Sequence, residues 1–333
     1  MPTIEDRRGR PLRDLRISVT DRCNFRCRYC MPREHFGKSF KFLPRADLLS
    51  FEEITRVARV FVGQGVSKLR LTGGEPLLRA ELPRLVEQLA KLNVDLALTT
   101  NGSLLEKSAR ELAAAGLGRV TVSLDSLDEG VFRAMTDAHY GVDEVLAGIE
   151  AAAAAGLGPI KINCVVRRGV NDHTLVELAR HFKGRHTVRF IEYMDVGSTN
   201  GWRLNEVVSG REIVERVHRE LPLREADPAY RGEVASRFRF ADGSGEIGVI
   251  TSVTQPFCGD CTRLRLSAKG TLYTCLYASA GTDLRELLRS GADDAQLEKL
   301  VRALWRGRED RYSEQRSAET QGARRIEMSY IGG

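Results

Sequence analysis

Long hydrophobic runs are missing from this 333-residue sequence, and its longest bland stretch, residues 151–155, is far too short to cross a bilayer. Residues 1–8 contain no apolar core of the kind that marks a protein for export, so we expect a cytoplasmic location. No low-complexity tract is present, and 42% of the residues are hydrophobic, which is typical of a folded globular protein. The length suits one large barrel-type domain or two domains.

The cysteines do not have the pattern of a disulfide framework. There are seven, an odd number, and C-x-x-C spacings without an export signal indicate metal binding in a reducing compartment. Six of them form two triplets: Cys23, Cys27 and Cys30, and Cys258, Cys261 and Cys275. Each triplet is one ligand short of a closed four-ligand site. The pattern therefore predicts two open metal sites, one for a cofactor and one for a substrate.

The net charge of +6 has two interpretations. It indicates either a solvated, arginine-rich surface or an anionic partner, which could be nucleic acid or a phosphorylated small molecule. Composition alone leaves these alternatives open, and the positions of the arginines must decide.

Six short β-branched or leucine-rich runs alternate with helix-period segments between residues 12 and 195. The predicted strands are residues 15–20, 68–72, 96–100, 119–123, 160–165 and 187–191, and the predicted helices are 51–64, 81–92, 104–115, 142–155 and 174–182. This α/β pattern predicts a partial TIM-type barrel of six β/α repeats over residues 1–205. A smaller C-terminal α+β segment, residues 206–333, has a predicted hairpin at 233–240 and 246–253 and contains the second cysteine triplet.

Polar and apolar residues alternate strictly along the predicted strands. Arg16 and Ser18 share one face of the first strand, and Lys68 and Arg70 share one face of the second. Because helices must cover the apolar face, the polar faces should line the inside of the sheet. The sequence therefore predicts a wet, cationic interior that holds a charged ligand.

The first triplet follows the first predicted strand with the spacing C-x3-C-x2-C, and a Gly73-Gly74-Glu75-Pro76 turn closes the second strand. These motifs resemble the radical S-adenosylmethionine (SAM) superfamily. The resemblance implies a four-iron, four-sulfur (4Fe–4S) cluster whose open iron chelates SAM and yields a 5′-deoxyadenosyl radical. It assigns SAM contacts to Tyr29, Gly74, Glu75, Ser123 and Met194. The glycines are expected to let backbone carbonyls approach the ligand.

The second triplet, Cys258-x2-Cys261-x13-Cys275, narrows the resemblance, together with residues 14–23 and the terminal Gly332-Gly333. These residues closely resemble the GTP 3′,8-cyclase family of radical SAM enzymes. The resemblance implies a second 4Fe–4S cluster, whose open iron takes the guanine of GTP. It assigns substrate contacts to Arg16, Arg70, Thr99, Lys161, Arg189, Arg263, Leu264 and Arg265, with Lys68 as a further candidate. Arg263, Arg265, Gly332 and Gly333 receive catalytic roles, and Cys164 is predicted to be a buried apolar residue.

The resemblance implies conversion of GTP to (8S)-3′,8-cyclo-7,8-dihydroguanosine 5′-triphosphate in the first step of molybdenum cofactor biosynthesis. The resemblance also implies an external electron donor and transfer of the product to cyclic pyranopterin monophosphate synthase. No nucleic-acid or membrane partner is expected, and homodimer formation is left open. One alternative is a peptide-modifying radical SAM enzyme with an auxiliary cluster. The other is a zinc-containing, basic nucleic-acid-binding protein, which would explain the charge but not the Gly73–Pro76 turn.

Overall fold

A computed structural model describes residues 3–316 and 324–332, and its central feature is one twelve-stranded sheet. The strand order is β12-β11-β10-β1-β2-β3-β4-β5-β6-β9-β8-β7. The first six strands are β1(Asp14–Ser18), β2(Lys68–Thr72), β3(Asp95–Thr100), β4(Arg119–Ser123), β5(Lys161–Val166) and β6(Thr187–Glu192). Each of them pairs in parallel with the next. The predicted partial barrel of six β/α repeats is confirmed.

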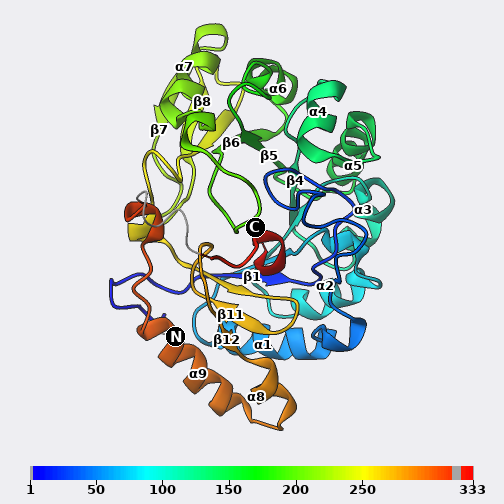
Figure 1. The fold of residues 1–333 in the computed structure, drawn as a ribbon, viewed down its shortest axis with the longest axis vertical. Coiled ribbons are helices and arrows are strands. Elements are labelled where there is room, and N and C mark those ends of the chain that lie inside the picture. Colours follow the sequence, from blue (N-terminus) through cyan, green and yellow to red (C-terminus); the bar gives the residue numbers. More distant parts are fainter. Residues whose placement is uncertain (1–2, 317–323, 333) are drawn as a thin grey trace.

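Helices cover the apolar outer face of these strands, and the ring of strands and helices is visible in Figure 1. They are α1(Phe51–Gly63), α2(Leu82–Ala90), α3(Leu105–Ala114), α4(Glu129–Thr136), α5(Val142–Ala154) and α6(Leu175–Phe182). Helix α1 begins with a capping box between Ser50 and Glu53, which satisfies backbone donors at its first turn. Leu15, Ile17 and Leu69 are fully buried beneath the helices. Alternation along the strands therefore leaves their polar side chains on the inner face.

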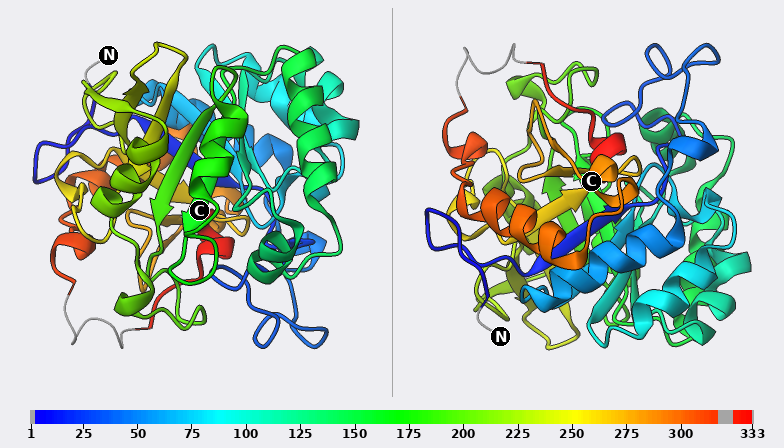
Figure 2. Two further views of the ribbon diagram at one scale, coloured as in Figure 1. Left: turned by 90° about the horizontal axis from the view of Figure 1, so that it is seen from above. Right: turned by 90° about the horizontal axis from the view of Figure 1, so that it is seen from below.

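The C-terminal part of the chain extends this sheet at both edges. Its strands are β7(Leu223–Ala226), β8(Ser236–Phe240), β9(Glu246–Ile250), β10(Arg263–Leu266), β11(Thr271–Tyr273) and β12(Thr282–Asp283). Strand β9 pairs in parallel with β6, and β10 pairs in parallel with β1. The helices of this part are α7(Gly210–Glu220), α8(Arg285–Arg289), α9(Asp294–Arg306) and α10(Met328–Ile331), and Figure 2 shows α8 and α9 (orange) beside α1. The sequence predicted the β8–β9 hairpin but missed α4 and β7.

The pairing of β1 with β10 determines where the two cysteine triplets lie. Cys23, Cys27 and Cys30 follow the carboxyl end of β1, whereas Cys258 and Cys261 precede the amino end of β10. Cys275 follows β11, which runs antiparallel to β10 and so returns the chain to that same end. Parallel pairing therefore places the triplets at opposite ends of the same pair of strands.

Short 3-10 helices connect several elements: η1(Arg45–Asp47), η2(Pro76–Leu78), η3(Leu204–Glu206), η4(Cys258–Asp260) and η5(Tyr312–Glu314). Within residues 3–316 and 324–332, none of the helices has the length and apolar character needed to span a membrane.

Candidate active site

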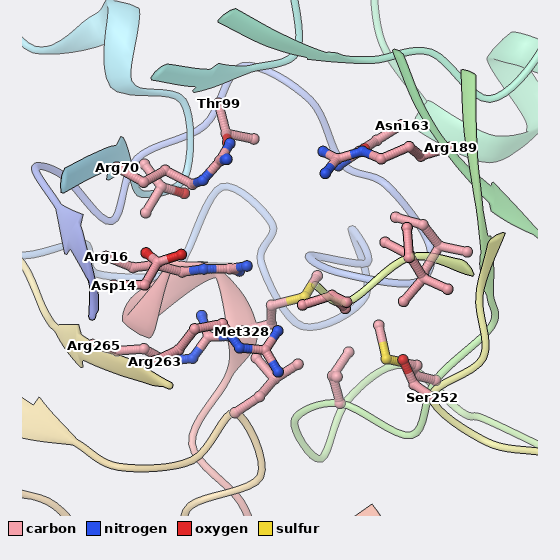
Figure 3. A pocket seen from close by; sticks show the side chains of 18 of the residues that line it. Asp14, Arg16, Arg70, Thr99, Asn163, Arg189, Ser252, Arg263, Arg265 and Met328 are labelled. Atoms are coloured by element: carbon pink, nitrogen blue, oxygen red, sulfur yellow. The ribbon is translucent and has the colours of Figure 1, made fainter. Parts of the chain in front are cut away.

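The inner face of the sheet surrounds a cavity of about 780 Å³ that reaches both cysteine triplets. All six cysteines of the triplets line it, together with Arg16, Lys68, Arg70, Thr99, Ser123, Lys161, Arg189, Arg263 and Arg265. Figure 3 shows five of these arginines reaching into one space from different strands. The polar interior that the strand alternation predicted is therefore present, and it brings together nearly all of the predicted site residues.

The first cysteine loop packs directly on the Gly73-Gly74 turn. Gly73 has φ +146°, and a Cβ on Gly74 would lie 2.3 Å from the carbonyl oxygen of Arg22. The backbone nitrogens of Gly74 and Glu75 donate to the carbonyls of Thr20 and Arg22 at 2.9 and 2.8 Å. The glycines are thus required for close approach to the cysteine loop. Both glycines also line the cavity, and their expected approach to a ligand stays a prediction.

Glu75 is not among the residues that line the cavity, and its predicted contact with SAM stays a prediction. Its side chain is fully buried, and its carboxylate accepts hydrogen bonds from Thr100 Oγ1 at 2.8 Å, the Asn101 nitrogen at 2.7 Å and the Leu77 nitrogen at 3.0 Å. Burial raises the pKa of Glu75 to about 7. Glu75 therefore connects the end of β2 to the end of β3 behind the cavity wall.

Two polar residues near the first triplet were missed by sequence reasoning. Asp125 accepts a hydrogen bond from the Tyr29 hydroxyl at 2.8 Å and from the Val165 nitrogen at 2.8 Å. Asn101 donates to Asn24 at 2.8 Å and lies 3.9 Å from Cys23 Sγ. Both follow the carboxyl ends of parallel strands, where α/β proteins place functional side chains, and that position was a usable signal.

Buried carboxylates and low polarity surround the first triplet. Burial raises the pKa of the Cys23 thiol to about 12, and the charge of Glu75 adds to this effect. The pKa of Cys27 is also raised well above its usual value, by burial and then by Cys23 and Asp125. An uncharged thiol is thus favoured at this loop until a cation arrives to compensate the thiolates.

The second triplet has cationic surroundings instead. Arg308 Nη2 donates to Cys261 Sγ at 3.2 Å and Arg263 Nη2 donates to the same sulfur at 3.4 Å. Burial opposes ionisation of Cys261, but the charges of Arg263 and Arg308 outweigh it and lower the pKa of this thiol to about 6. Burial raises the pKa of Cys275 to about 11.

The donor set fits iron–sulfur clusters better than single ions. All six triplet cysteines are free thiols at the cavity wall. Among residues 3–316 and 324–332, no three His, Cys, Asp or Glu side chains are close enough to hold one metal ion. In a 4Fe–4S cluster each thiolate binds a different iron, so its ligands stand further apart than those of a zinc ion. Cys164 is fully buried in the apolar core, as predicted.

The arginines of the cavity are buried (Arg70 and Arg265) or half-buried (Arg16, Arg189 and Arg263) and outnumber the acidic residues beside them. Burial, followed by the charges of Arg265 and Arg263, lowers the pKa of Arg16 well below its usual value. Burial also lowers the pKa of Arg189 to about 9 and that of Arg265 to about 10. In the described part of the chain, Arg16 Nε and Arg70 Nε are buried and lack hydrogen-bond partners. Such a cluster of buried cations is stabilised by a polyanion.

Neighbouring polar groups hold some of these cations in place. Arg70 donates to Thr99 Oγ1 at 2.9 Å and to Thr121 Oγ1 at 3.1 Å, and Arg189 donates to Asn163 Oδ1 at 2.9 Å. Asp14, an acidic residue that sequence reasoning did not identify, lies 3.5 Å from Lys68 Nζ.

Leu264, which is predicted to contact the substrate, can do so only through its backbone. Its side chain is fully buried in the hydrophobic core, because alternation along β10 points Arg263 and Arg265 into the cavity and Leu264 away from it. Only its backbone remains available to a substrate.

The C-terminal tail enters the ring of strands, where Figure 1 shows α10 (red). Arg265 Nη1 donates to the carbonyl of Gly332, and a Cβ on Gly332 would lie 2.4 Å from Thr72 Cγ2. Met328 lines the cavity. Gly333, predicted to be catalytic, lies outside the described residues.

The loop after β6 holds this tail. Asp195 accepts hydrogen bonds from Tyr312 at 2.7 Å, Arg316 at 3.0 Å and Arg325 at 3.0 Å. Glu327 accepts from the Ser198 nitrogen at 3.0 Å. Met194, beside Asp195, lines the cavity. One loop therefore reaches both the predicted SAM site and the tail.

Comparison with known proteins identifies the family. The Radical SAM superfamily matches residues 17–182, and Molybdenum Cofactor Synthesis C matches residues 186–314. A protein of Acidothermus cellulolyticus named GTP 3′,8-cyclase is 56% identical, with 99% of each chain covered. The chain belongs to the GTP 3′,8-cyclase family. Other proteins named GTP 3′,8-cyclase are 50% identical in Xanthomonas campestris pv. campestris (99% of this chain, 97% of the relative) and 46% identical in Staphylococcus epidermidis (99% of each).

Among solved structures, Streptococcus suis SuiB bound to S-adenosylmethionine is similar, with a TM-score of 0.62 and 17% identity over 88% of this chain and 68% of that one. This similarity confirms that the chain has the radical SAM fold.

Proposed function

We propose that this chain is a radical SAM GTP 3′,8-cyclase, which converts GTP to (8S)-3′,8-cyclo-7,8-dihydroguanosine 5′-triphosphate in the first step of molybdenum cofactor biosynthesis. The observation that carries the proposal is the convergence of Arg16, Arg70, Arg189, Arg263 and Arg265 on a cavity with a cysteine triplet at each end. Full-length relatives named GTP 3′,8-cyclase support it.

The first part of the chain, residues 1–205, is proposed to bind the cofactors. Cys23, Cys27 and Cys30 would hold one 4Fe–4S cluster, which with bound SAM supplies a 5′-deoxyadenosyl radical. Gly74, Ser123 and Met194 line the cavity beside this loop and are proposed to contact SAM. Tyr29 is fixed by its hydrogen bond to Asp125 and is proposed to hold the loop in shape.

The second part, residues 206–333, is proposed to fix the substrate at its base. Cys258, Cys261 and Cys275 would hold the second 4Fe–4S cluster, with an open iron for guanine. The arginines, with Lys68, Lys161 and Thr99, are proposed to bind the triphosphate, since guanidinium groups donate two hydrogen bonds to one phosphate. Holding GTP at both ends restricts its ribose to one position in the cavity.

The tail is proposed to complete the site. Arg265 donates to Gly332, so substrate and tail share one guanidinium. Gly333 is assigned to the site by family resemblance alone.

Two partners and a location complete the proposal. An external electron donor would reduce the first cluster, and the product would pass to cyclic pyranopterin monophosphate synthase. A cytoplasmic location is also proposed. The six proposed ligand cysteines must stay reduced, and the cytoplasm is a reducing compartment.

Anaerobic cluster reconstitution followed by turnover with GTP and SAM tests the function. We expect roughly eight irons per chain, the sum of two four-iron clusters. We also expect GTP to raise 5′-deoxyadenosine release and the cyclised nucleotide to appear as product. Colourless protein that holds zinc, or 5′-deoxyadenosine release that GTP leaves unchanged, would contradict the proposal.

A further inference from the structure

The C-x-x-C segment of the second triplet is held by two buried arginines from opposite ends of the chain. Arg308 follows α9 and donates through Nη1 to the Cys261 carbonyl at 2.7 Å and through Nη2 to Cys261 Sγ at 3.2 Å. Arg10, near the N-terminus, donates through Nη1 to the Cys258 carbonyl at 2.7 Å. Arg308 is only 4% exposed and Arg10 only 1%. A single guanidinium thus fixes both the backbone and the sulfur of Cys261.

Asp6 connects these two arginines. Its buried carboxylate accepts from Arg10 Nε at 2.6 Å and lies 3.3 Å from Arg308 Nη1. Trp305 supports the arrangement from behind: its ring centroid lies 4.5 Å from Arg308 Cζ, and its indole nitrogen donates to the Arg10 carbonyl at 3.0 Å. The guanidinium of Arg308 is therefore preorganised, and its approach to sulfur does not depend on a mobile surface side chain.

The hydrogen bonds to sulfur differ in charge between the two triplets. At the second triplet, Cys261 Sγ receives hydrogen bonds from two guanidinium groups, those of Arg308 and Arg263. At the first, the hydrogen bonds that Cys23 Sγ receives within residues 3–316 and 324–332 come from neutral donors, the Phe25 nitrogen at 3.4 Å and Asn101 Nδ2 at 3.9 Å. Hydrogen bonds and net charge at the ligand sulfurs are among the factors that determine the reduction potential of an iron–sulfur cluster.

The direction of the effect follows from charge. Three thiolates and a 4Fe–4S core that carries two positive charges sum to about −1, and reduction by one electron makes the sum about −2. A fixed cation at a ligand sulfur stabilises the more negative state more strongly. Charge-assisted hydrogen bonds are also roughly twice as strong as neutral ones.

We infer that Arg308 is a positioning residue that holds the Cys261 thiolate and raises the reduction potential of the second cluster. The inference rests on the proposed function, because it takes Cys261 as an iron ligand. It assigns to Arg308 a role distinct from phosphate binding, although its side chain also reaches the cavity wall.

The test measures the second cluster alone and without GTP. In full-length protein with the first triplet replaced (Cys23→Ala, Cys27→Ala and Cys30→Ala), the midpoint potential is followed by redox titration monitored by electron paramagnetic resonance. Arg308→Met removes the charge and keeps an unbranched, apolar stem. Arg308→Lys keeps the charge but loses the planar guanidinium. Arg306→Met is a matched control on an exposed neighbour.

We expect Arg308→Met to lower the ratio of reduced to oxidised cluster about tenfold at a fixed potential. This corresponds to a midpoint potential that is lower by about 59 mV for a one-electron couple. Arg308→Lys should shift it less, and Arg306→Met should leave it unchanged. The reciprocal background, with the second triplet replaced, should show no shift of the first cluster in Arg308→Met.

An unchanged potential in Arg308→Met with four irons retained would overturn the inference. If Arg308→Met loses its iron while Arg308→Lys keeps it, the need for a cation at Cys261 is supported; equal loss in both would reduce the role to packing and overturn it. Absence of iron in the first-triplet background with Arg308 intact would instead contradict the second cluster itself, and so the proposed function.

Discussion

The two cysteine triplets use the same number of thiols in opposite surroundings. The first follows β1 and has the buried carboxylates of Glu75 and Asp125 nearby, and burial raises the pKa of its Cys23 thiol to about 12. The second precedes β10 and lies against Arg263 and Arg308, whose charges lower the pKa of Cys261 to about 6. Two sites with the same number of cysteine ligands can therefore differ in the charge that surrounds the sulfur atoms. The cations around the second triplet favour an anionic ligand at that end of the cavity, whereas the carboxylates around the first do not.

The largest effect is expected when one thiol is removed from each triplet, which tests whether the two triplets have different roles. Cys27→Ala should abolish both SAM cleavage and cyclisation, because the proposed cofactor cluster loses a ligand. Cys258→Ala should abolish cyclisation but leave slow 5′-deoxyadenosine release. Chromatography of both products from one reaction checks this. Equal loss of 5′-deoxyadenosine in the two variants would contradict separate tasks for the two triplets.

Arg265 tests the substrate end without touching a thiol. Arg265→Met removes a buried cation that also donates to Gly332, and loss of one partner of a buried charged contact costs about 2–5 kcal/mol. We expect kcat/KM for GTP to fall by at least ~30-fold while SAM still binds. Steady-state kinetics and SAM binding check this, with exposed Arg239→Met as control. A variant with unchanged kcat/KM would remove Arg265 from the substrate site.

Asp195 tests whether the loop that bears Met194 also controls the tail. Asp195→Asn keeps the shape but loses the charge that Tyr312, Arg316 and Arg325 contact. Hydrogen bonds to charged groups are worth about 1.5–3 kcal/mol, so cyclisation should fall by roughly tenfold or more. Hydrogen exchange of residues 324–332 should accelerate, whereas Glu309→Gln, an exposed control, should change neither. Unaltered exchange in Asp195→Asn would show that the tail is held by other contacts.

A pH dependence of stability rather than of activity is expected beside the first triplet. Burial raises the pKa of Glu75 to about 7, above its unfolded value of about 4.3. The folded protein thus binds this proton more tightly, and the associated stability is present below about pH 4.3 and lost as the pH rises towards 7. Glu75→Gln cannot ionise and therefore does not lose this stability as the pH rises. The free energy of unfolding of Glu75→Gln minus that of the wild type should increase by on the order of 3 kcal/mol between pH 5 and 7.5.

Urea denaturation of cluster-loaded wild type and Glu75→Gln, taken in parallel at pH 5, 6 and 7.5, measures this difference. A difference that does not vary with pH would mean that Glu75 keeps an ordinary pKa. Because the comparison is between two proteins, other groups that titrate in the same range cancel.

Much of this arrangement could be predicted from the sequence because it depends on periodicity and spacing. Alternation along β1 and β2 correctly placed Arg16, Lys68 and Arg70 on the inner face. The same alternation, applied to β10, would have placed the side chain of Leu264 in the core and left only its backbone for a substrate.

Contacts between distant segments could not be predicted in this way. The contact of Arg308 with Cys261 joins residues 47 positions apart, and that of Arg10 with Cys258 joins residues 248 positions apart. Glu75 belongs to the turn that the resemblance assigns to SAM, yet its carboxylate accepts hydrogen bonds from Thr100 and Asn101. Only the folded sheet reveals these partners.

Mössbauer spectroscopy of iron-57-loaded protein, kept free of air and compared with and without SAM and GTP, tests the central claim most directly. Two open clusters at opposite ends of one cavity predict roughly eight irons, with one iron site perturbed by SAM alone and a different one by GTP alone. A single cluster, or two clusters of which neither responds to GTP, would contradict it.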